Sequence, residues 1–185
     1  MPNPVIAEVT RGGIVESRHT GAFAVVDGAG KLIRSAGDFA APIFPRSAIK
    51  AFQCVPVIES GAADRFGFTE EEVALACSSH NGEPDHVRVA RSMLKKAQNG
   101  EEHFECGAHW PYDEAAARAL AAHGGEPTAL HNNCSGKHAG FVCLGCTLAG
   151  SGADLRQFLK GYVEPGHPLM REVTAALGAA TGVDL

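Results

Sequence analysis

The order in which two periodic patterns occur is the feature that most constrains the fold of this chain. Residues 5–36 contain four short segments rich in β-branched residues. Gly12-Gly13 and Asp27-Gly28-Ala29-Gly30 supply turns between them. From Ser47 onward, apolar residues recur at helical spacing instead. Strands followed by helices predict an α+β fold, in which helices pack on an antiparallel sheet.

The helical half of the sequence carries clear start and stop signals. Thr69 and Glu72 form a capping box, which predicts a helix start. Gly182 is placed to end the last helix. The most apolar helix should also be the most buried, and it holds Cys143 and Cys146 as core residues. We expect helices over residues 47–59, 69–77, 83–99, 113–123, 135–148, 153–163 and 168–180.

Size and charge exclude several classes of protein. The chain has 185 residues, of which 45% are hydrophobic, and this suits a single globular domain over 1–185. The net charge is −5, with Lys and Arg scattered along the chain, so we expect no nucleic-acid partner. No secretion signal or membrane-spanning run is present, and we expect a cytoplasmic protein with reduced cysteines. Because a helical pattern stops just before Leu185, we also expect a C-terminally truncated domain.

Ser47 and Lys50 form the first motif with chemical potential. They lie three residues apart, so they share one face of a helix. A serine needs a base before it can attack a carbonyl, and a lysine held partly out of water can supply one. Pro45 and Arg46 precede the pair and would expose the serine. The plainer interpretation is a serine that caps a helix, followed by a solvated lysine.

Two later motifs resemble the first in composition. Ser79 beside His80 offers a second nucleophile, although small polar residues there could simply cap the next helix. Cys134 lies at a predicted helix start next to Lys137 and His138. A thiolate is favoured at such a position, as a nucleophile or as a metal ligand. Trp110 and Tyr112 are expected to pack rather than to bind a ligand.

Taken together, these motifs resemble the asparaginase II family of amidohydrolases. The matching segments occur in order and span nearly the whole chain: Arg11-Gly12-Gly13-Ile14-Val15-Glu16, Arg46-Ser47-Ala48-Ile49-Lys50, Ser79-His80, Asn133-Cys134-Ser135-Gly136-Lys137-His138 and Gly166-His167-Pro168. The resemblance implies a fold similar to serine β-lactamases and glutaminases. It also implies hydrolysis of L-asparagine to L-aspartate and ammonia.

The resemblance further implies residue roles. Ser47 and Lys50 would form a first serine–lysine pair, and Ser79 would belong to a second. Separately, Arg46, His80 and Asn133 are candidates for binding the substrate, and structural anchoring is an equal alternative for Arg46. Cys134 and Lys137 would be two ligands of a zinc ion, a set that is incomplete within this chain. Which serine is the nucleophile stays open.

Two other functions remain as alternatives. Cys134 could be the nucleophile of an amidase, with His138 as its base. The chain could instead be a non-catalytic module that binds zinc or a protein partner. A homodimer is compatible with either enzyme.

Overall fold

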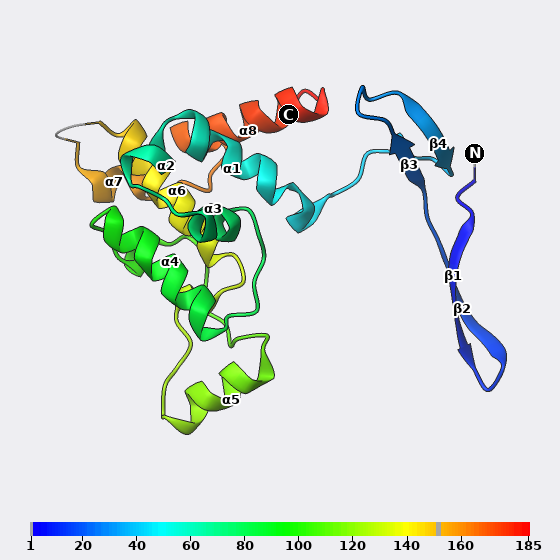
Figure 1. The fold of residues 1–185 in the computed structure, drawn as a ribbon, viewed down its shortest axis with the longest axis horizontal. Coiled ribbons are helices and arrows are strands. Elements are labelled where there is room, and N and C mark those ends of the chain that lie inside the picture. The colour runs from blue at the N-terminus through cyan, green and yellow to red at the C-terminus, as the bar shows by residue number, and fades with distance from the viewer. Residues whose placement is uncertain (1, 151–152) are drawn as a thin grey trace. The chain divides into compact units, whose positions relative to one another are not determined.

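The structure is a computed structural model that describes residues 2–150 and 153–185 (Figure 1). The contacts divide the chain into two compact units, Met1–Phe44 and Pro45–Leu185. All of the predicted strands fall in the first unit, and all of the predicted helices fall in the second. The α+β composition expected from the sequence is therefore present.

The first unit consists of two antiparallel hairpins. β1 (Val5–Arg11) pairs with β2 (Ile14–Thr20), and β3 (Phe23–Val26) pairs with β4 (Leu32–Ala36). Gly12 and Gly13 both adopt positive φ, as the tight turn between β1 and β2 requires. The expectation of one antiparallel sheet is wrong, because the hairpins form two separate two-stranded sheets. The strand residues are exposed or half-buried, so no core forms on either sheet.

The second unit is helical. Its helices are α1 (Lys50–Glu59), α2 (Ala62–Arg65), α3 (Glu70–Ala76), α4 (Pro84–Lys96), α5 (Glu114–Ala122), α6 (Ser135–Leu148), α7 (Leu155–Leu159) and α8 (Pro168–Thr181). Short 3₁₀ turns, η1 (Arg46–Ile49), η2 (Glu101–His103) and η3 (Ala129–His131), lie between them. No helix in the described ranges is long and apolar enough to cross a bilayer.

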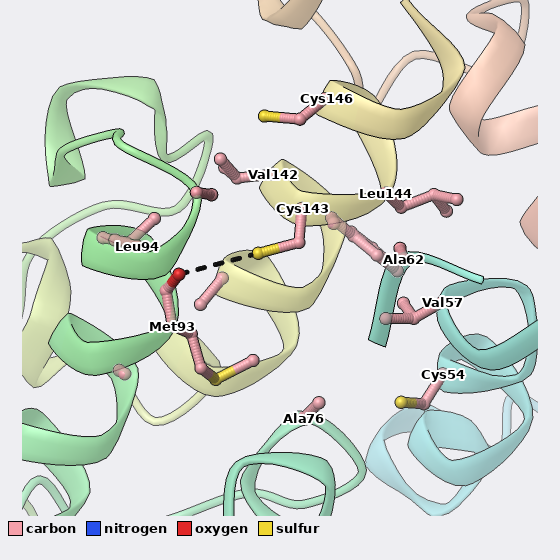
Figure 2. Close-up of a cluster of buried hydrophobic side chains, with 14 of the residues drawn as sticks. Cys54, Val57, Ala62, Ala76, Met93, Leu94, Val142, Cys143, Leu144 and Cys146 are labelled. Atoms are coloured by element: carbon pink, nitrogen blue, oxygen red, sulfur yellow. Dashed lines mark hydrogen bonds between the residues drawn. The ribbon is translucent and has the colours of Figure 1, made fainter. Parts of the chain in front are cut away.

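Helix α6 forms the centre of this unit. Eleven of its residues are buried, and helices α1, α2, α3, α4, α7 and α8 all contact it. Figure 2 shows Cys143 of α6 pointing toward Met93 of α4, with Val57 of α1 and Ala62 of α2 nearby. Cys143 donates to the Met93 carbonyl across 3.7 Å. Its burial and that of Cys146 confirm the prediction that both are core cysteines.

The strongest local signals are confirmed. Helix α6 covers the predicted residues, the Thr69–Glu72 capping box is formed, and Gly182 ends α8 with a φ of 69°. The segment expected as one helix from Ser47 divides into η1 and α1. Trp110 and Tyr112 are 46% and 64% exposed, so neither ring joins the core, although the Tyr112 ring stacks on His109 with 4.8 Å between the ring centroids.

Candidate active site

Lys50 is the residue around which the candidate site is built. It opens α1, and only 3% of its surface is exposed. Its Nζ contacts the Ser79 Oγ at 2.7 Å, the Cys134 Sγ at 3.1 Å and the Ser78 carbonyl at 3.2 Å. The three hydrogens of an ammonium group match these three acceptors. One buried amine therefore joins the start of α1, the loop after α3 and the start of α6.

The two candidate serines differ in their relation to this amine. Ser79 follows α3, has an exposed side chain, and contacts Lys50 directly. Ser47 lies in η1 and is also exposed, but its side chain makes no hydrogen bond within the described residues. Arg46 precedes it in the left-handed region with a φ of 50°, which agrees with the strained entry expected from the sequence. The structure thus brings together Lys50 and Ser79, not Lys50 and Ser47.

Cys134 lies at the boundary of α6 with its thiol between two polar groups. Its Sγ accepts from the Lys50 Nζ at 3.1 Å and donates to the Asn133 Oδ1 at 3.4 Å. The backbone carbonyl of Asn133 accepts from the backbone N–H of His80 at 3.1 Å. The backbone N–H of Asn133 donates to the His109 Nε2 at 3.0 Å. The Asn133 backbone therefore fixes the start of α6 beside the Ser79 loop.

Lys137 lies in the first turn of α6. Burial lowers the pKa of its amine, which favours the neutral form, while the neighbouring Cys134 acts in the opposite direction. Its Nζ lies 5.4 Å from the centre of the Phe141 ring. Nearby, burial raises the pKa of Cys106 to about 11, and the Cys134 charge acts in the same direction.

Two of these groups have the chemistry of zinc ligands, but the set is small. A thiolate and a neutral amine can both donate to zinc, which usually takes four ligands in proteins. In the described ranges, no three His, Cys, Asp or Glu side chains gather in a group that could hold a metal. Cys134 and Lys137 therefore do not by themselves make a closed zinc site.

His80 tethers the Ser79 loop to α6. The Gly82 N–H donates to its Nδ1 at 3.1 Å, so the ring proton lies on Nε2 and donates to the Ser135 Oγ at 2.9 Å. Burial, with the charges of His86 and Lys50, lowers the pKa of His80 to about 4. A neutral imidazole thus holds the loop that presents Ser79.

His138, which the sequence suggested as a base for Cys134, is a second neutral imidazole with a different partner. His138 is buried, and its Nδ1 contacts the hydroxyl of the fully buried Tyr162. That hydroxyl also accepts from the Glu105 N–H at 3.1 Å, so its own proton goes to the histidine. Burial lowers the pKa of His138 to about 3. The sequence offered only a general indication of this contact: a buried tyrosine needs a hydrogen-bond partner for its hydroxyl.

A hollow of about 390 Å³ opens beside Ser79. Ser79 and His80 line it, together with Asp85, His86 and Arg88 from the first turns of α4. Ser47 and Arg46 are not part of its lining. An exposed serine, a buried amine in contact with it and a hollow beside the serine are features that a nucleophilic acyl-transfer site needs.

The comparison with known families agrees with these features. A sequence model described as L-asparaginase II matches residues 7–185, which is almost the entire chain. No curated protein matches the sequence of this chain. The match spans both hairpins and every motif that meets at Lys50. On this evidence the chain belongs to the L-asparaginase II family.

Proposed function

We propose that this protein hydrolyses L-asparagine to L-aspartate and ammonia, with Ser79 as nucleophile and Lys50 as its base. Family membership supports the activity. The assignment of Ser79 as nucleophile and Lys50 as base rests on the 2.7 Å contact between the Lys50 Nζ and the Ser79 Oγ. Ser79 takes the role of nucleophile in this proposal because Ser47 makes no comparable contact in the part of the chain that the structure describes.

The first chemical step follows from this contact. In its neutral form, Lys50 offers a lone pair to the Ser79 hydroxyl and accepts its proton as the Oγ attacks the side-chain amide carbon. The resulting ammonium keeps two further acceptors, the Ser78 carbonyl and the Cys134 Sγ. It can then give a proton to the amide nitrogen, which leaves as ammonia when the bond between carbon and nitrogen breaks. Water releases aspartate from the ester by the same steps in reverse order.

The start of α6 provides candidates for stabilising the oxyanion. The N–H groups of Gly136 and Lys137 have no acceptor within the described residues. Free N–H groups at a helix start favour negative charge, and one such donor contributes about 3 kcal/mol to a transition state. If zinc binds, Cys134 and Lys137 are the residues that would hold it, and a Lewis acid there would polarise a carbonyl.

The alternative with Cys134 as nucleophile has less geometric support. The Cys134 thiol contacts Lys50 and Asn133, whereas the proposed base, His138, is hydrogen-bonded to Tyr162 through Nδ1. The remaining nitrogen, Nε2, then carries the ring proton and is not a base. For this reason we favour the serine.

The activity is tested by measuring ammonia release from L-asparagine and L-glutamine with the purified chain and with Lys50→Met. We expect release from L-asparagine and its loss in the variant. Lys31→Met is a matched control, because Lys31 is an exposed lysine of the first unit. A folded wild-type chain that releases no ammonia from either amide would contradict the proposal, as would full activity in Lys50→Met.

A further inference from the structure

A second hollow of the helical unit lies away from Lys50. It measures about 760 Å³ and runs between α4 and α5. In Figure 1, α5 stands out from the other helices next to α4. A volume of this size is in the range of small-molecule sites, which hold roughly 300–1,000 Å³.

One wall of this groove is cationic. Arg88, Arg91 and Lys95 of α4 line it at spacings of three and four residues, so they follow one face of the helix. At a rise of 1.5 Å per residue they span about 10 Å. No carboxylate of the described residues lines the groove, although the whole chain has a net charge of −5.

The three cations of this wall differ in whether they form ion pairs. Arg88 pairs with Asp85 at 3.0 Å and with Glu71 at 3.6 Å. Arg91 and Lys95, by contrast, make no ion pair with any described residue, and both are exposed. Glu101 and Glu102 line an adjacent hollow that also contains Arg91 and Lys95, but neither carboxylate lines this groove. The two cations therefore present their positive charge to an anion bound in the groove.

The opposite wall is apolar. Ala116, Ala119 and Leu120 line it from α5, again at helical spacing. None of the residues of α5 is buried, although most of them are alanine or leucine. An apolar helix face that is left partly exposed can be covered by the apolar part of a ligand.

The end of the groove is fixed by Gly82. This residue has a φ of 77°, and a Cβ there would lie 3.0 Å from the His131 carbonyl oxygen. The nearby Asn81 carbonyl accepts from the N–H of Asp113, which caps α5. The wall of the groove is therefore connected to the loop that carries Ser79.

We propose that the groove between α4 and α5 is a binding site for a small amphipathic anion, in which Arg91 and Lys95 hold the anionic group and Leu120 contacts the apolar body. The charge of one wall and the apolar character of the other define this class of ligand. The proposal does not depend on asparagine hydrolysis, because none of the residues in contact with Lys50 lines the groove.

The test is isothermal titration of the chain with decyl phosphate, and with decyltrimethylammonium as a probe of opposite charge and equal tail length. We expect saturable binding of decyl phosphate that weakens as salt is added. The double variant Arg91→Glu/Lys95→Glu should weaken binding by about tenfold or more, since two attractions become repulsions. Leu120→Ala should weaken it by a few-fold.

Arg171→Glu is the matched control, because Arg171 is an exposed, unpaired arginine of α8 outside the groove. If the charge reversal disturbs folding in circular dichroism, Arg91→Gln/Lys95→Gln replaces it. The proposal is overturned if decyl phosphate does not bind, if decyltrimethylammonium binds equally well, or if the variants leave the affinity unchanged. It also fails if the groove proves to be the contact between two copies, shown by a dimer that the charge reversal dissociates.

Discussion

The 3₁₀ turn with Ser47 and the loop with Ser79 both expose a serine. Only the Ser79 loop is held by side-chain contacts to the neighbouring helices. Ser79 is in contact with Lys50, and its neighbour His80 is hydrogen-bonded to α6. Ser47 follows a strained Arg46 and has no side-chain partner in the described part of the chain. Sequence spacing joins Lys50 to Ser47, whereas packing of α1 against α3 and α6 joins it to Ser79.

The largest expected difference is in activity. Ser79→Ala should reduce kcat/KM for L-asparagine by about a thousandfold or more, because it removes the proposed nucleophile. Ser47→Ala should reduce it less than about tenfold, since its hydroxyl contacts no catalytic group. Steady-state ammonia release by the two variants measures the contrast. The reverse ranking would exchange the roles of the two serines.

Gly136 allows α6 to approach α3, and so brings Cys134 to Lys50. A Cβ at this position would lie 2.5 Å from the Leu75 carbonyl oxygen. Gly136→Ala should therefore lower the free energy of unfolding by about 3 kcal/mol, because backbone must move. Urea denaturation measures this loss. Gly166→Ala is the control, since a Cβ there meets nothing within 4 Å.

The buried, hydrogen-bonded His80 beside Ser79 predicts that the free energy of unfolding depends on pH. The turn that contains Ser47 has no such histidine next to its serine. Burial lowers the pKa of His80 to about 4, compared with about 6.5 in an unfolded chain. Between these values the unfolded chain binds more protons, so stability is lost as the pH falls. His80 alone should contribute a loss of about 2.5 kcal/mol between pH 7 and pH 4.5.

Urea denaturation of the wild type and His80→Asn at both pH values isolates this contribution. The variant should lose less stability on acidification than the wild type, although His138 adds a loss of the same sign in both proteins. Equal losses in the two proteins would show that His80 is not held neutral in the folded state.

The smallest predicted effect concerns α3, which leads to the Ser79 loop. Glu72 is 2% exposed, caps α3 through the Thr69 N–H, and pairs with Lys96 at 2.6 Å. Burial alone would raise the pKa of Glu72, but hydrogen bonds from Lys96 and Thr69 together lower it. The ionised Glu72 carboxylate therefore stabilises the folded protein at neutral pH. This stabilisation disappears as the pH falls through the lowered pKa of Glu72.

Glu72→Gln should destabilise the protein by about 2 kcal/mol, because Lys96 loses its buried partner. Glu70→Gln is the control, since Glu70 is an exposed acid in the same helical turn. Thermal denaturation of both variants at pH 7 compares them. An equal loss of stability would show that burial of the pair contributes nothing.

Local signals predicted much of the helical unit, because they depend on neighbouring residues. The Thr69–Glu72 capping box, the bounds of α6 and the Gly182 cap are examples. The separation of the hairpins was not predicted, because strand patterns do not specify which strands pair. The contacts of Lys50 with Ser79 and Cys134 join residues 29 and 84 positions apart, so no spacing rule could reveal them.

The central claim is that Lys50 activates Ser79, and the most direct measurement is the site of the acyl group during turnover. The reaction with L-asparagine is stopped in acid within milliseconds, and the digested protein is analysed by mass spectrometry. We predict an aspartyl ester on the peptide that contains Ser79. An ester on Ser47, or a thioester on Cys134, would contradict the claim.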